Sequence, residues 1–103
     1  MEKINAIIDI LQDVKAKDIM AYDFQGTSPY YDSFIIATAN ERQASAAANH
    51  IKQKFGMDIR GVEGKGSPWV LIDLTDIVIH IFREEDRAYY NFEQRLLGIK
   101  RII

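Results

Sequence analysis

Residues 69–82 read WVLIDLTDIVIHIF, and this stretch decides the fold of the chain. Both halves are rich in aliphatic and aromatic residues, a composition typical of β-strands. Thr75 and Asp76 separate the halves and favour a tight turn. The sequence therefore predicts a β-hairpin, with strands over 69–74 and 76–82 and a turn around Thr75.

The two faces of this hairpin differ in chemistry. Side chains alternate between the faces of a strand, so across a two-residue turn the even positions of one strand share a face with the odd positions of the other. One face is then wholly aliphatic and is predicted to be core: Val70, Ile72, Leu74, Ile77, Ile79 and Ile81. The other face mixes large apolar residues with ionisable ones: Trp69, Leu71, Asp73, Val78, His80 and Phe82.

The mixed face allows two interpretations. It is either a second buried face beneath a terminal helix, with Asp73 and His80 at a wet edge, or an exposed surface of aromatic anchors with polar orienting groups, as in protein-binding hot spots. Large exposed apolar patches are uncommon on monomers, so the alternation alone favours burial. The pattern by itself leaves both open.

The remaining sequence predicts one domain over residues 1–103, of the α/β (α+β) class. Apolar spacing indicates helices over 2–15, 40–55 and 84–97, and strands are expected over 18–24, 33–39 and 58–63. Asn40 and Gln43 have the spacing of a capping box for the middle helix. Tyr89, Phe92 and Leu96 are assigned to the inner face of the last helix. The order predicts a mixed five-stranded sheet flanked by helices.

Composition excludes several classes of function. The chain has no cysteine, so disulfides and thiolate metal sites are excluded, which fits a reducing compartment. The N-terminus does not resemble a signal peptide, and no apolar run approaches the roughly 20 residues of a membrane span. We therefore expect a cytoplasmic protein without membrane contact. With 13 basic and 15 acidic residues, little direct nucleic-acid contact is expected, and a protein partner is favoured.

Catalytic chemistry is not indicated. Asp73 and Asp76 are separated by a turn, whereas metal-binding carboxylates of nucleotidyltransferases normally lie one residue apart on one strand face. No phosphate-binding loop, nucleophile elbow or cluster with metal-ligand spacing is present. We expect a nucleotidyltransferase-like topology without the catalytic motif, and neither catalytic residues nor a cofactor nor a metal.

Four ordered motifs resemble the ribosomal silencing factor family, also called the iojap family. The hairpin 69–82 is similar to that family's tryptophan-valine-leucine, aspartate and histidine-x-phenylalanine signature. The strand 32–39, the pair Arg42-Gln43 and the segment 87–96 are similar to further family motifs in the same order. Ala39 and Leu97 depart from the usual glycine and tryptophan. The resemblance spans about residues 4 to 97.

The resemblance implies a translational repressor and not an enzyme. Family members bind large-subunit ribosomal protein fourteen (uL14), obstruct joining of the small subunit when nutrients are scarce, and are linked to large-subunit maturation. The resemblance favours the interpretation of the mixed face as a docking surface. The partner-binding residues then expected are Trp69, Leu71, Asp73, His80, Phe82, Arg87 and Tyr90. For Arg42, a role in a surface ion pair and a role as a partner contact are equally expected. The alternatives are a nucleotidyltransferase-related protein that binds nucleotide and magnesium, and a homodimerisation module; the chain is expected to be a monomer or weak homodimer.

Overall fold

A mixed six-stranded sheet forms the centre of the computed structural model, which describes residues 2–103. Its strand order is β3-β4-β5-β2-β1-β6, and only β2 and β5 pair in parallel. The strands are β1 Lys17–Asp23, β2 Ser33–Thr38, β3 Gly61–Glu63, β4 Trp69–Asp73, β5 Ile77–Phe82 and β6 Lys100–Arg101. The α+β class with a mixed sheet is confirmed. The short strand β6 is a sixth strand beyond the five predicted.

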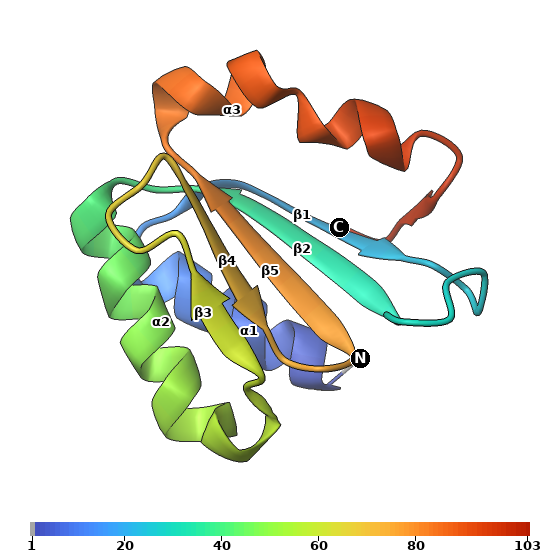
Figure 1. Cartoon of the computed structure of the whole chain (residues 1–103), viewed down its shortest axis with the longest axis horizontal. Helices are drawn as coiled ribbons and strands as arrows, with labels where there is room; N and C mark the ends of the chain where they lie inside the picture. Colours follow the sequence, from blue (N-terminus) through green and yellow to red (C-terminus); the bar gives the residue numbers. More distant parts are fainter. Residues whose placement is uncertain (1) are drawn as a thin grey trace.

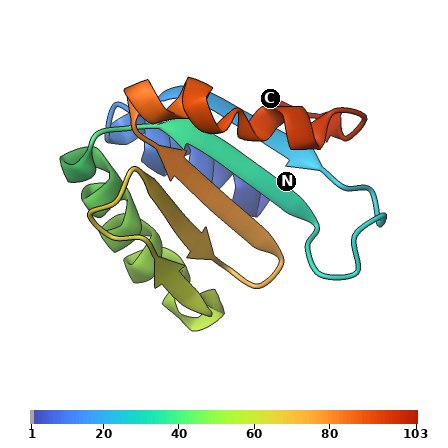
Figure 2. The same ribbon diagram turned by 45° about the horizontal axis from the view of Figure 1, so that its top comes forward.

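Helices cover the two faces of the sheet unequally (Figures 1 and 2). Helices α1 (Glu2–Asp13) and α2 (Glu41–Phe55) pack on one face, and α2 continues into the short 3-10 turn η1 (Gly56–Asp58). The small side chains of Ala44, Ala47 and Ala48 let α2 approach the sheet closely. The capping box is confirmed, since Asn40 Oδ1 accepts from the Gln43 backbone and Gln43 Oε1 accepts from the Asn40 backbone.

The hairpin has the predicted register. Trp69 pairs with Phe82 and Leu71 with His80, while Val70 pairs with Ile81 on the opposite face. The Leu74 backbone N–H donates to the Ile77 carbonyl at 2.8 Å, which closes the tight turn. The whole predicted aliphatic face is buried in the main core together with α1 and α2. The division of the hairpin into two faces is therefore confirmed.

The predicted last helix, 84–97, is wrong as a single element. Helix α3 (Glu84–Tyr90) ends at Asn91, whose φ of 43° is left-handed, and the chain continues as the 3-10 helix η2 (Phe92–Leu96). The break changes which side chains face the sheet, so Phe92 and Leu96 are buried as predicted but Tyr89 is 81% exposed. We call residues 84–96 the C-terminal segment; it lies across the face opposite α1 and α2 (Figure 1).

Candidate functional site

The mixed face of the hairpin lies under the C-terminal segment. Phe82 is fully buried and His80 is 3% exposed. Both pack against Phe92 of η2, with ring-centroid separations of 6.0 Å and 4.5 Å. We call this group the aromatic cluster, and its members are Phe34, Trp69, His80, Phe82, Tyr90 and Phe92. Two predicted docking residues, His80 and Phe82, thus lie inside the molecule.

Trp69 joins the interior of this cluster to its surface. It is half-buried, with ring centroids 5.0 Å from Phe82 and 5.2 Å from Tyr90. Its indole Nε1–H donates to His80 Nδ1 at 3.2 Å. Because a directed hydrogen bond and contacts with neighbouring rings hold it, the indole has a defined orientation. Tyr90 beside it is 39% exposed.

His80 is a neutral histidine. Burial lowers its pKa from the ordinary 6.5 to about 4, because the charged form would lose its hydration. Since Nδ1 accepts from Trp69, the ring proton belongs on Nε2. Within residues 2–103, Nε2 has no hydrogen-bond partner, a burden of roughly 1–3 kcal/mol for a buried donor. His80 therefore supports the Trp69 indole from beneath.

Arg87 anchors the C-terminal segment and is only 8% exposed. Its Nη1 donates to Thr38 Oγ1 at 2.7 Å and to the Asp18 carbonyl at 3.1 Å. Its Nε lies 3.1 Å from Glu93 Oε2, an ion pair that ties α3 to η2 across the break at Asn91. The guanidinium, a predicted partner contact, is thus engaged within the fold.

A surface groove of about 410 Å³ remains open beside the aromatic cluster. We call it the Trp69 groove; it lies between β4, the loop before β4 and the end of α3, and its lining residues are Glu63, Gly64, Ser67, Pro68, Trp69, Leu71 and Tyr90. Three predicted docking residues, Trp69, Leu71 and Tyr90, therefore meet at one surface. The sequence did not single out Glu63 or Pro68, although the glycine-rich loop next to Trp69 was a signal for a shaped edge.

The loop at this groove depends on Gly64. Its φ is +79°, and a Cβ there would lie 2.2 Å from the Trp69 carbonyl oxygen. Such a contact is far inside van der Waals distance, so only glycine fits without a backbone shift. Gly64 thereby sets how the chain enters β4, and with it the position of the Trp69 ring.

Asp73 lies at the far end of β4 from Trp69. Its Oδ1 accepts from the Thr75 backbone at 2.8 Å, and Oδ2 is 3.5 Å from Arg60 Nη2. Asp76 instead pairs with Lys3 at 2.8 Å, so the two carboxylates have separate cationic partners. No group of three or more His, Asp or Glu side chains is arranged to hold a metal among the residues described.

A family model described as ribosomal silencing factor during starvation matches residues 1–96. The chain belongs to the ribosomal silencing factor family. It is 38% identical over 98 residues to ribosomal silencing factor RsfS of Halalkalibacterium halodurans, covering 90% of this chain and 84% of that one. It is 39% identical over 87 residues to RsfS of Bacillus subtilis, covering 80% and 74%. The membership that the four motifs predicted is thereby confirmed.

Solved structures agree with this membership. The crystal structure of a protein from Chromobacterium violaceum superposes with a TM-score of 0.79 at 34% identity, covering 92% of this chain and 84% of that one. Membership makes the chain a ribosomal silencing factor, acting in translation regulation through the ribosome. Among residues 2–103, no helix is long and apolar enough to cross a membrane.

Proposed function

We propose that the chain represses translation by docking on the large ribosomal subunit through uL14, in the cytoplasm, and blocking the small subunit sterically. The observation that carries this proposal is the Trp69 groove, where Trp69, Leu71 and Tyr90 reach the surface together. Aromatic anchors around a concave apolar surface are the usual core of a protein-binding hot spot. Binding alone suffices for this activity, and no catalytic step enters it.

The fold holds the groove ready for a partner. Trp69 is oriented by His80 and Phe82 beneath it, and Tyr90 is fixed by the anchored C-terminal segment. A partner then meets side chains that lose little conformational freedom on binding, which favours affinity. In this division of roles, Trp69, Leu71 and Tyr90 contact the partner, whereas Phe82, His80 and Arg87 support them.

The size of the chain explains how it can obstruct the much larger small ribosomal subunit. A standard protein contact uses about 800 Å² per partner, and the chain exposes 6171 Å². Most of its surface therefore stays outside the docking contact and occupies the space that the small subunit needs. The same docking is compatible with a role during large-subunit maturation.

Leu71 offers the sharpest test, because it lines the groove without being part of the aromatic cluster. Leu71→Asp is expected to weaken binding to isolated uL14 and to large subunits by at least about 30-fold, the loss of a hot-spot contact of about 2 kcal/mol. It should also restore subunit joining in a sedimentation assay. Leu97→Asp is the matched control, since Leu97 is 78% exposed and lies outside the groove. Equal binding by both variants and wild type would refute the proposal.

A further inference from the structure

Helix α2 is basic after its first residue, Glu41. Residues 42–57 contain Arg42, Lys52 and Lys54 but no Asp or Glu, although the chain as a whole has a net charge of −2. Spacings of three, four and three residues place Arg42, Ser45, Asn49 and Lys52 on one outward stripe of the helix. All four are exposed, and the buried residues of α2 lie on its other side.

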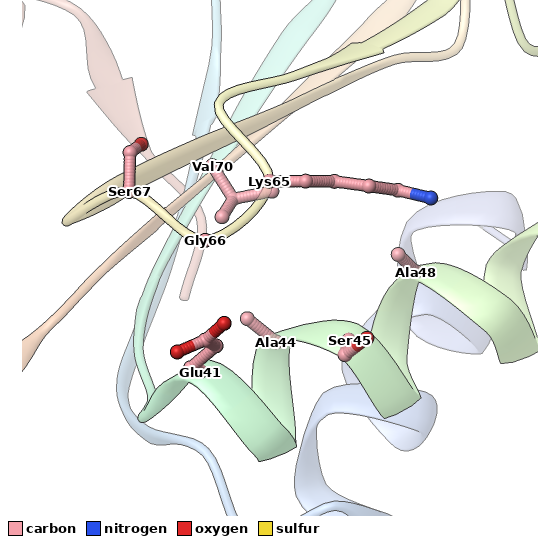
Figure 3. Close-up of a pocket in the computed structure, with 8 residues that line it drawn as sticks. All are labelled: Glu41, Ala44, Ser45, Ala48, Lys65, Gly66, Ser67 and Val70. Atoms are coloured by element: carbon pink, nitrogen blue, oxygen red, sulfur yellow. The ribbon is translucent and has the colours of Figure 1, made fainter.

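Lys65 extends this stripe from a different part of the chain. It lies in the loop before β4 and lines a cavity of about 120 Å³ together with Ser45 and Ala48 of α2. Figure 3 shows its side chain extended toward Ala48, with Glu41 at the other end of the cavity. We call Arg42, Ser45, Asn49, Lys52 and Lys65 the basic strip. Glu41, the carboxylate lining that cavity, is 3.4 Å from Arg83.

The positions of these cations are not explained by the stability of the fold. Within residues 2–103, Arg42, Lys52 and Lys65 form no ion pair. Lys52 lies in the last turn of α2, where a cation favours the helix dipole. Arg42, however, is in the first turn, where a positive charge opposes the dipole by roughly 0.3–1 kcal/mol. An external anion would account for Arg42 and Lys65.

The basic strip is continuous with the Trp69 groove. Ser67 lines both the groove and the cavity beside α2, and Lys65 and Gly66 connect them in the same loop. A partner seated in the groove would therefore bring the strip against whatever borders that partner. On a large ribosomal subunit, ribosomal proteins are bordered by RNA, whose phosphates match cations and whose phosphate and ribose oxygens accept from Ser and Asn side chains.

We propose that the basic strip binds the phosphate backbone of ribosomal RNA beside the protein partner of the Trp69 groove. The inference rests on the proposed function, because docking supplies the RNA at high local concentration. Three cations on an acidic chain bind free RNA weakly, but the same contacts become intramolecular once the groove is occupied. The strip would thereby add affinity and fix the orientation of the docked protein.

The test is the triple variant Arg42→Gln, Lys52→Gln, Lys65→Gln, titrated against whole large subunits over a range of salt concentrations. Each lost phosphate contact should lower the slope of log affinity against log salt by about 0.7–1. We expect a slope lower by about 2–3 and affinity weaker on the order of tenfold near physiological salt. Binding to isolated uL14 should change by less than about twofold, because no RNA is present.

The matched control is Lys15→Gln, Lys17→Gln, Lys100→Gln, which removes the same charge from exposed positions outside the strip. It should retain the wild-type slope. An unchanged slope in the strip variant, or an equal loss of affinity for isolated uL14, would overturn the RNA assignment. If wild type itself fails to bind subunits, the proposed function fails instead, so the two failures are distinguishable.

Discussion

Removing the Phe92 ring should detach the C-terminal segment from the aromatic cluster. Phe92 is 7% exposed, and its ring contacts those of Phe34, Trp69, His80 and Phe82 at 4.5–6.0 Å between centroids. Buried Phe→Ala changes cost about 3–5 kcal/mol. We expect about 3 kcal/mol for Phe92→Ala, because a short 3-10 segment can shift to fill part of the space.

Urea unfolding followed by fluorescence measures this directly, since Trp69 is the only tryptophan and lies in the cluster. The variant should unfold at lower urea with a red-shifted native emission, because water reaches the indole. Leu97→Ala, at a residue 78% exposed, should change stability by less than about 0.5 kcal/mol. A loss below about 1 kcal/mol for Phe92→Ala with unchanged emission would show that the segment does not cover this face.

Three further predictions concern the support of the Trp69 groove. Burial lowers the pKa of His80 from 6.5 to about 4, so the contribution of neutral His80 to the free energy of unfolding is complete above pH 6.5 and is lost as pH falls toward 4, by about 3 kcal/mol in all. The stability difference between wild type and His80→Phe should follow this course. A difference independent of pH would contradict it. Gly64→Ala should lower the free energy of unfolding by more than about 2 kcal/mol, whereas Gly26→Ala, at similar φ but with open space around it, should lower it by about 1 kcal/mol. Equal losses of stability for the two variants in calorimetry would oppose the steric argument. Arg87→Met should lower the free energy of unfolding by about 2–4 kcal/mol, since it removes the buried donor to Thr38 and leaves Glu93 unpaired. A loss under about 0.5 kcal/mol in chemical denaturation would rule out an anchoring role.

The core was predictable from the sequence because side chains alternate between the two faces of a strand, and this determines which of them are buried. The aliphatic side of the hairpin needed only strand periodicity and a two-residue turn, and the pairing of Val70 with Ile81 follows from both. The helix 41–55 was equally accessible through Asn40 and its capping partner. Such features depend on neighbours within a few residues along the chain.

The cover over the mixed face was not predictable in detail. The sequence 84–97 has an unbroken helical pattern, yet Asn91 adopts a left-handed conformation that brings Phe92 down onto the sheet. Arg87 holds this geometry through contacts with β1 and β2, which are distant in sequence, and through its ion pair with Glu93. As a result, the prediction could not separate the buried His80 and Phe82 from Trp69, Leu71 and Tyr90 at the surface.

The basic strip was hidden for a similar reason. Along the sequence, Arg42 and Lys52 are ten residues apart, and Lys65 lies outside their helix in a loop, so no basic cluster is evident. The near balance of basic and acidic residues therefore predicted little nucleic-acid contact. Helix periodicity and the packing of that loop on α2 bring the three onto one surface.

The most direct test of the docking surface is a cysteine footprint on the Trp69 groove. The chain has no cysteine, so Leu71→Cys and Leu97→Cys each introduce a single thiol, one inside the groove and one outside it. The rate of thiol alkylation is measured for the free proteins and with saturating large subunits. We predict at least about tenfold protection at position 71 and little at position 97, because a hot-spot core excludes water. Equal alkylation rates at position 71 with and without bound subunits would contradict docking through the groove.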